Sequence, residues 1–252
     1  MTDPRLTKWA ETLIHYSLEL QPGQQLLIRA DEAAIPLASE VYRSALRVGA
    51  HPHVVVQIDG LDEIFLNNAE DAQLDWVSPI RTFEYETIDA LCAITAPTNT
   101  AALSGVDAAR QARAQKANSQ VRRALFARAA KGEAKWVLTL YPTHAAAQNA
   151  GMSLAQYEDF LLRAMFLDRD DPAQAWRDFS QKQQRYVDYL NGVQTLRFVA
   201  RDTDLTMRVA GRTWINSDGH RNFPSGEIFT GPIEDSVEGY VRYTFPTAHL
   251  GN

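Results

Sequence analysis

The first 142 residues alternate short apolar runs with longer segments whose apolar positions recur at helical spacing. The segment at residues 3–20 is one example, because Leu6, Trp9, Leu13, Ser17 and Leu20 would share one helix face. Apolar, β-branched runs predict four strands, near residues 26–30, 53–58, 90–96 and 135–141. Because strands alternate with helices, the pattern predicts an α/β fold with a mostly parallel sheet flanked by helices.

Capping residues mark where several of these helices begin. Asp3 precedes Pro4, a proline suited to the first helical position. Ser153 and Gln156 have the spacing of a capping box before an apolar run. A further helix is predicted from Asp171–Pro172 to Gly192. Each signal is local and does not depend on the rest of the fold.

The pattern changes near residue 193, where strands and turns replace helices. Four short strand-like runs follow: TLRFVA, DLTMRVAG, EIFTGP and GYVRYTFP. We therefore predict two units, an N-terminal α/β domain with a helical extension at residues 1–192 and a β-rich segment at residues 193–252. The second unit is short for an independent domain.

Composition and charge indicate which kinds of binding partner and cellular location suit the chain. The chain has 252 residues, 45% of them hydrophobic, and a net charge of -6, which argues against nucleic acid or an anionic membrane as its partner. No apolar run approaches the roughly 18 residues of a transmembrane helix, and the N-terminus does not resemble a signal peptide. These features predict a cytoplasmic protein. The single cysteine, Cys92, is expected to be a buried core residue, with a reactive thiol as the alternative.

A basic run is the most conspicuous charge feature. Its functional interpretation is a patch for phosphate or nucleic acid, and its structural interpretation is a solvated helix face. We favour the second, because no aromatic residues are interleaved to stack on bases. The run comprises Arg110, Arg113, Lys116, Arg122, Arg123, Arg128, Lys131 and Lys135.

Common catalytic and metal motifs are absent from the sequence. The six histidines show no His-Glu-x-x-His or other metal spacing, and His51 and His53 are expected to begin a strand. No glycine-rich phosphate loop or G-x-S-x-G motif is present. The sequence therefore argues against a dinucleotide enzyme, a P-loop ATPase and an α/β-hydrolase.

Glu227 is the remaining candidate. It follows Pro-Ser-Gly and precedes Ile-Phe-Thr-Gly-Pro. Judged by composition alone, it is either an exposed strand residue or a metal ligand, since hard oxygen ligands suit divalent ions. His220, in the turn NSDGHRN, could approach the same site.

The string RTWINSDGHRNFPSGEIFTGPIEDSVEGYV, preceded by RDTDLTMRVAG, closely resembles the thermophilic-type metallo-aminopeptidases of peptidase family M29. LELQPGQQLLIRAD, VYRSALRVGAHPHVVV and AWRDFSQKQQRYVDYLN resemble the N-terminal half of that family in the same order. The resemblance covers essentially the whole chain. It implies that residues 193–252 begin a metal-binding catalytic domain.

The resemblance also implies the chemistry. Glu227 would be the first ligand of two divalent ions, zinc or cobalt, that act on peptide substrates in a homodimer. The other ligands and the general base would lie in a C-terminal region that has no counterpart here, so the catalytic residues stay unknown. His249 matches no family ligand. We therefore expect a truncated aminopeptidase, inactive alone, and the alternative is a non-catalytic α/β folding or dimerisation module.

Overall fold

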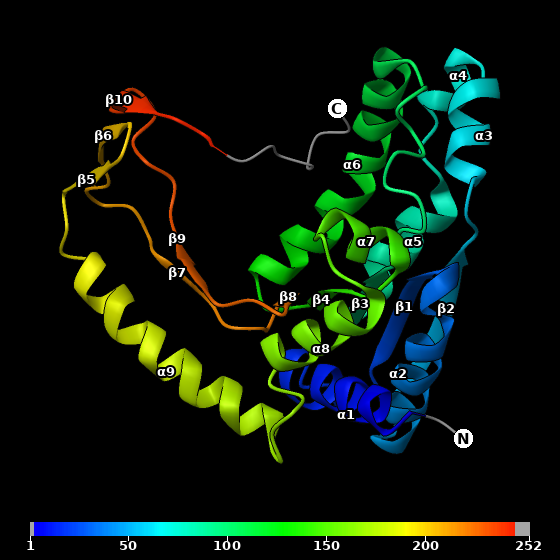
Figure 1. Cartoon of the computed structure of the whole chain (residues 1–252). Coiled ribbons are helices and arrows are strands. Elements are labelled where there is room, and N and C mark those ends of the chain that lie inside the picture. Colours follow the sequence, from blue (N-terminus) through cyan, green and yellow to red (C-terminus); the bar gives the residue numbers. More distant parts are fainter. Residues whose placement is uncertain (1–2, 245–252) are drawn as a thin grey trace.

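A five-stranded parallel sheet organises the N-terminal part of the chain in this computed structural model, which describes residues 3–244 (Figure 1). The strand order is β2-β1-β3-β4-β8. Every pairing in the sheet is parallel, which confirms the predicted sheet and its four strands. The strands are β1 (Gln25–Asp31), β2 (His51–Gln57), β3 (Ala90–Thr95), β4 (Lys135–Leu140) and the short β8 (Asn222–Phe223).

One face of the sheet is covered by α1 (Pro4–Thr12), the π-helical turn η1 (Leu13–Ser17) and α2 (Ile35–Arg47). The segment predicted as one helix is thus α-helical first and π-helical in its last turn. The larger core lies here, and the buried side chains at its centre include Trp9, Leu13, Ile28, Leu37, Val41 and Cys92. Cys92 is fully buried, as predicted, and burial raises the pKa of its thiol to about 12.

The opposite face is covered by α5 (Pro79–Thr87) and the long α6 (Ala108–Ala130). Two further helices, α3 (Leu61–Asn68) and α4 (Asp71–Leu74), pack on the first half of α6. A second core fills the space under α5 and α6, and its residues include Leu27, Tyr85, Leu91, Val121 and Leu125. Helices on both faces complete the α/β architecture expected from the sequence.

Two arginines of the basic run bind helix ends, which differs from the expected solvated face. Arg110 donates hydrogen bonds to the carbonyl oxygens of Leu66 and Ala69 at the end of α3. Arg128 donates to the carbonyl oxygen of Ile88, just beyond α5, at 2.7 Å. The last carbonyls of a helix lack intrahelical donors, so these guanidinium groups satisfy polar groups that helix formation leaves unpaired. Part of the run therefore has a structural role.

Three helices follow β4: α7 (His144–Asn149), α8 (Leu154–Ala164) and α9 (Pro172–Leu190). The predicted capping box of α8 is confirmed, because Ser153 Oγ accepts from the backbone N–H of Gln156 and the Gln156 side chain accepts from that of Ser153. Asp171 caps α9 as predicted.

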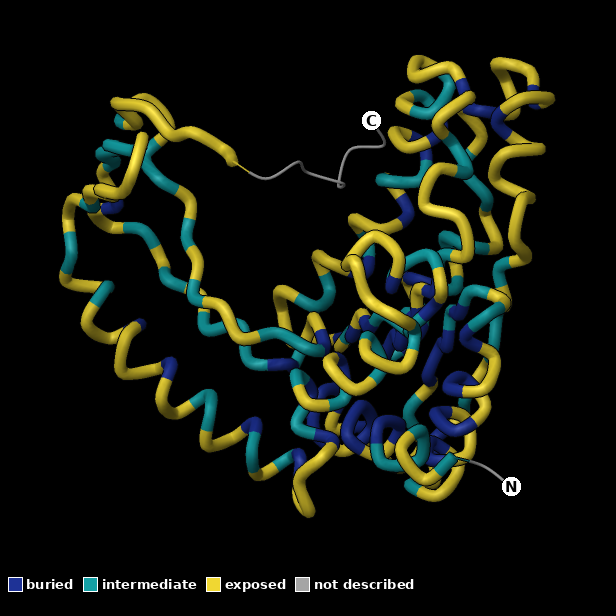
Figure 2. Tube along the Cα trace, in the orientation of Figure 1, coloured by how far each residue is buried: buried dark blue, intermediate teal, exposed yellow. Residues whose placement is uncertain are grey.

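Beyond α8 the chain forms an extension, which we call the arm: α9 and two small antiparallel sheets (Figure 1). The rest of the described chain, including β8, is called the body. The first arm sheet contains β5 (Thr195–Ala200), β6 (Thr203–Arg208) and β10 (Glu238–Val241), and the second contains β7 (Ile215–Ser217) and β9 (Glu227–Phe229). Figure 2 shows that exposed residues dominate the arm, whereas buried residues concentrate in the body.

Trp176, in the second turn of α9, joins the arm to the body. Its side chain is 1% exposed and lies within the larger core. The ring contacts Phe223 of β8 and Phe166, with centroid separations of 5.5 and 5.1 Å, and Nε1 donates to the carbonyl oxygen of Met165. β8 comes from beyond the boundary placed near residue 193, yet it lengthens the sheet of the body. The division into two domains at that position stays a prediction.

Within residues 3–244, none of the helices combines the length and apolar character needed to cross a membrane.

Candidate functional site

Glu227 is the first residue of β9, which pairs with β7 so that Glu227 lies opposite Ser217. The residue is exposed. Among the described residues no ion pair engages its carboxylate. An exposed carboxylate without a cationic partner keeps its oxygen lone pairs available, which is compatible with a ligand role. The structure does not test that role, so it stays a prediction.

The turn before Glu227 needs glycine at position 226. Gly226 has φ +121°, a conformation that side-chain-bearing residues rarely adopt, and its N–H donates to the carbonyl oxygen of Ser217 at 3.0 Å. A Cβ there would meet the Phe179 ring of α9 at 3.1 Å. Ser217 and Ser225 also join their hydroxyl groups across the same turn at 2.5 Å. The turn at Ser225 and Gly226 therefore places β9 alongside α9.

Amide side chains attach this hairpin to α9. Gln183, which is buried, donates from Nε2 to Asn216 Oδ1 at 2.6 Å and to the carbonyl oxygen of Ser217 at 3.2 Å. Asn216 Nδ2 donates in turn to the carbonyl oxygen of Ser180 at 3.0 Å. Buried amides with paired donors and acceptors hold a backbone in one register. They hold the strand opposite Glu227 in place.

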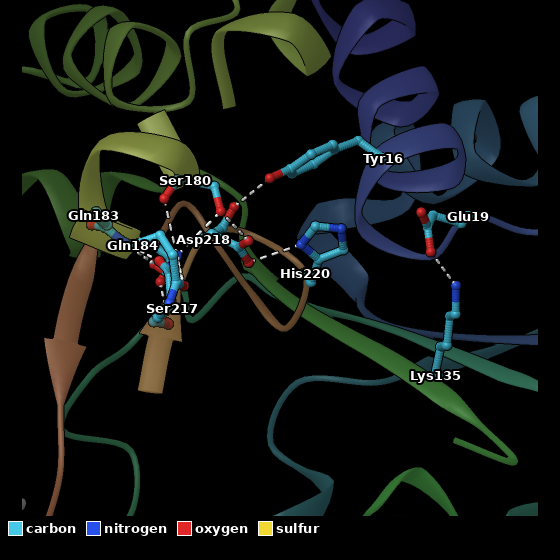
Figure 3. A network of polar contacts seen from close by, with 11 residues as sticks. Tyr16, Glu19, Lys135, Ser180, Gln183, Gln184, Ser217, Asp218 and His220 are labelled. Carbon is cyan, nitrogen blue, oxygen red and sulfur yellow. Dashed lines mark hydrogen bonds and ion pairs between the residues drawn. The ribbon is translucent and has the colours of Figure 1, made fainter. Parts of the chain in front are cut away.

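An Asp–His pair lies just beyond β7, between the arm and the body (Figure 3). His220 Nδ1 and Asp218 Oδ1 are 2.8 Å apart, and Ser180 Oγ donates to Asp218 Oδ2 at 2.8 Å. From η1, the Tyr16 hydroxyl donates to the carbonyl oxygen of Asp218, also at 2.8 Å, and its ring lies 4.5 Å from the imidazole. These contacts orient the imidazole with Nδ1 toward Asp218.

The electrostatics favour an ionised Asp218. Burial acts to raise the pKa of this carboxyl, but hydrogen bonds from His220 and Ser180 outweigh burial, so the pKa lies below its usual value. Burial, reinforced by the negative charge of Asp218, raises the pKa of Tyr16, which stays a neutral donor. An imidazole held at Nδ1 by a carboxylate presents Nε2 for a proton or a metal, and the His220 side chain is 41% exposed.

The structure brings His220 to Asp218 and Tyr16, and no described hydrogen bond or ion pair joins it to Glu227. Sequence reasoning selected His220 but missed its partners. Asp218 was detectable in principle, because it stands two residues before His220 in a glycine-containing turn. Tyr16 was not detectable, since 202 positions separate it from Asp218.

His15 precedes Tyr16 in η1 and is exposed, and among residues 3–244 no histidine other than His220 forms a hydrogen bond with Asp218. His51 begins β2 as predicted, and His53 Nε2 lies 3.7 Å from Glu84 on the far side of the body. His144 begins α7, and His249 lies outside the described residues. Across residues 3–244, no group of three or more His, Cys, Asp or Glu side chains is arranged to hold a metal ion. Glu227 is one candidate ligand, and a catalytic zinc site takes about three. The described residues therefore do not by themselves fit a complete metal centre.

Comparison with known proteins gives a consistent assignment. Residues 2–252 match the family model described as thermophilic metalloprotease (M29). The chain is 31% identical over 272 residues to Aminopeptidase 2 of Geobacillus stearothermophilus, covering 99% of this chain and 66% of that protein. It is 28% identical over 265 residues to Aminopeptidase T of Thermus thermophilus, covering 96% of this chain and 65% of the relative.

A solved structure, wild-type AmpT from Thermus thermophilus, superposes with a TM-score of 0.77 at 24% identity, covering 94% of this chain and 63% of that one. That likeness supports the fold. The chain spans just under two thirds of the length of these relatives. The match along residues 2–252 places the chain in the M29 family of metalloproteases.

Proposed function

We propose that this chain is part of a metallo-aminopeptidase that removes N-terminal residues from peptides. The observation that carries the proposal is the likeness along 99% of the chain to a relative named Aminopeptidase 2. The exposed carboxylate of Glu227, without an ion-pair partner among residues 3–244, is consistent with it. The absence of glycine-rich phosphate loops and of a G-x-S-x-G motif fits hydrolysis without a nucleotide or a serine nucleophile.

We further propose that Glu227 binds one of two divalent ions, zinc or cobalt. Such a pair supplies an activated water and a Lewis acid for the scissile carbonyl. Because no group of three or more ligand side chains gathers within residues 3–244, we propose that the metal site depends on ligands beyond them. A lone exposed carboxylate binds a divalent ion weakly. We therefore propose that the 252 residues alone hold no stoichiometric metal and do not hydrolyse peptides.

The partners we propose are peptide substrates and a second copy of the chain. Apolar side chains on the arm support self-association, since Phe229 and Val241 are 47% and 43% exposed. The sequence places a further apolar residue, Phe245, in the same segment, but it lies outside the described residues. A cytoplasmic location and the absence of nucleic-acid binding remain part of the proposal. Light scattering of the purified chain tests the association, and a monomer at high concentration would contradict it.

Two polypeptides test the enzymatic proposal: the 252-residue chain, and a fusion of this chain to the remaining third of Aminopeptidase 2. Both are titrated with cobalt and assayed on leucine p-nitroanilide. We expect turnover and bound cobalt from the fusion only. Glu227→Gln should abolish both in the fusion, whereas Glu238→Gln, a change of another exposed glutamate of the arm, should leave both intact.

A fusion that is folded by circular dichroism but binds no cobalt would overturn the aminopeptidase proposal. An active fusion whose turnover survives Glu227→Gln would overturn the ligand role of Glu227 alone. Metal-dependent turnover by the 252-residue chain would show that these residues hold a complete site.

A further inference from the structure

A cavity of about 450 Å³ lies in the body, well separated in the sequence from the Glu227 hairpin. It opens between α5, α6 and the sheet, where β1 and β3 approach their carboxyl ends. Its volume is within the range of small-molecule sites. Its lining includes Arg29, Arg81, Arg122, Phe126, Trp136 and Leu138.

The order of the strands explains why a cavity forms here. In the order β2-β1-β3-β4, the chain passes from β1 to β2 on one side and then returns to β3 on the other side of β1. Crossover connections leave in opposite directions from such a point, which opens a crevice at the carboxyl ends of the strands. Leu27 on β1 is buried in the second core. Arg29, two residues later on the same face of the sheet, lines the cavity beside Ala93.

Three arginines line the cavity, and the ion pairs found among residues 3–244 involve none of them. Arg29 donates to the Tyr85 hydroxyl at 2.9 Å, and Arg81 Nη1 donates to Asn118 Oδ1 at 2.7 Å. Both partners are neutral. Arg81 Nε is buried and has no partner in the described chain. Guanidinium groups oriented by neutral acceptors retain their full charge for an anion.

The carboxylates in the lining form no ion pair with these arginines and accept hydrogen bonds from neutral donors. Asp31 Oδ2 accepts from the backbone N–H of Ala96 at 2.6 Å, and Asp62 Oδ2 accepts from Gln57 Nε2 at 2.6 Å. Arg113, which lies on α6 with Arg122, differs from these arginines because its side chain pairs with two aspartates at 2.5 Å. Arg122, one of the exposed members of the basic run, faces this cavity without such a partner.

The remaining wall is apolar and aromatic. Phe126 of α6 and Trp136 of β4 meet edge to face, with ring centroids 5.5 Å apart, and Leu138 continues the surface along β4. Phe126 is 47% exposed and Leu138 is 38% exposed, so both offer apolar area that a ligand could cover. Burial of such area favours a ligand with an apolar group.

We propose that this cavity binds a small organic anion: a carboxylate or phosphate that contacts Arg29, Arg81 and Arg122, attached to an apolar group that lies on Phe126, Trp136 and Leu138. The charged groups select the anion, and the aromatic wall selects its apolar part. The proposal uses no residue of the Glu227 hairpin and does not rest on aminopeptidase activity.

The test uses the 252-residue chain and four probes of known chemistry: phenyl phosphate, 3-phenylpropionate, the neutral 3-phenylpropanamide and inorganic phosphate. Binding is followed by calorimetry and by tryptophan fluorescence. We expect saturable binding of at least one aromatic anion, weakened by salt, and about tenfold weaker binding of the amide and of inorganic phosphate. The two aromatic anions distinguish a carboxylate ligand from a phosphate ligand.

Two neighbouring arginines of α6 provide a matched pair of variants. Arg122→Gln should weaken binding about tenfold, whereas Arg123→Gln, an exposed arginine outside the lining, should leave it unchanged. Equal unfolding temperatures of the two variants show that the fold is intact. Trp136→Phe should remove the fluorescence change while calorimetric binding persists.

Equal affinity for the amide and for the anion, or equal losses in Arg122→Gln and Arg123→Gln, would overturn the proposal. So would the absence of saturable binding for both aromatic anions. Inorganic phosphate that binds as tightly as phenyl phosphate would overturn the role assigned to the apolar wall.

Discussion

The strands of the body and those of the arm both form backbone ladders but are buried very differently. In β1 of the body, Leu26, Leu27 and Ile28 are at most 1% exposed. In the arm, β5 and β6 form a continuous antiparallel ladder of six residue pairs, yet Phe198 and Val199 of β5 are 49% and 69% exposed. Backbone pairing therefore occurs in both regions, whereas only the sheet of the body has an apolar core on each of its two faces.

The difference separates two sources of stability. A backbone hydrogen bond exchanges for a bond to water on unfolding and contributes about 1 kcal/mol net. Apolar burial contributes roughly 25 cal/mol per Å² and dominates wherever side chains are enclosed. The body has both contributions, whereas the strands of the arm depend mainly on pairing and on their attachment to α9. We therefore expect the attachment points to control the stability of the arm.

The largest effect is expected from Trp176→Ala. This change removes a ring that is 1% exposed and packed against Phe166, Phe179 and Phe223, which should lower the free energy of unfolding by about 3–5 kcal/mol. Urea unfolding followed by circular dichroism measures the loss. Tyr189→Ala on the same helix is the control, because Tyr189 is 75% exposed and should cost less than about 0.5 kcal/mol. Similar losses in both variants would mean that Trp176 is not an anchor.

An intermediate effect is expected from Asp218→Asn. The carboxylate joins Ser180 of the arm to His220, and its loss should cost about 1–2 kcal/mol at neutral pH. Because the folded pKa of Asp218 lies below its ordinary value of 3.8, ionisation stabilises the fold above that value. This contribution disappears as the pH falls from 3.8 through the lower folded pKa.

The stability of the original chain and that of the Asp218→Asn variant should therefore converge as the pH is lowered through this range. Urea unfolding at pH 7, 5 and 3 measures the difference. A gap that stays constant with pH would show that the ionisation of Asp218 does not stabilise the junction.

The smallest effect is expected from Val199→Thr in β5. With Val199 at 69% exposure, the added hydroxyl stays hydrated, and the change should be less than about 0.5 kcal/mol. The same substitution at Val137 of β4, which is 0% exposed, buries a hydroxyl and should cost about 1–3 kcal/mol. Thermal unfolding of the two variants gives the comparison directly. An equal loss of stability at Val199 and at Val137 would mean that β5 is covered by a contact that is absent from residues 3–244.

Several features of the molecule were predictable from local sequence. The four parallel strands of the body correspond to apolar runs, and Asp3, Ser153 and Asp171 cap helices where their spacing indicated. Helices α3, α4 and α5 were not predicted, because they are short and their faces are mostly polar or exposed. β8 has two residues, which is too few for any periodic pattern to show.

The sequence by itself determined the four longer strands of the body, several of the helix starts and the family motif around Glu227, since these depend on neighbouring residues. Tertiary structure alone decided which side chains meet. It placed Tyr16 on the carbonyl of Asp218 and joined Arg110 to the end of α3. It also collected Arg29, Arg81 and Arg122 around one cavity. These contacts link residues far apart in the chain, and only the packing of helices on the sheet brings them within hydrogen-bonding or ligand-binding reach.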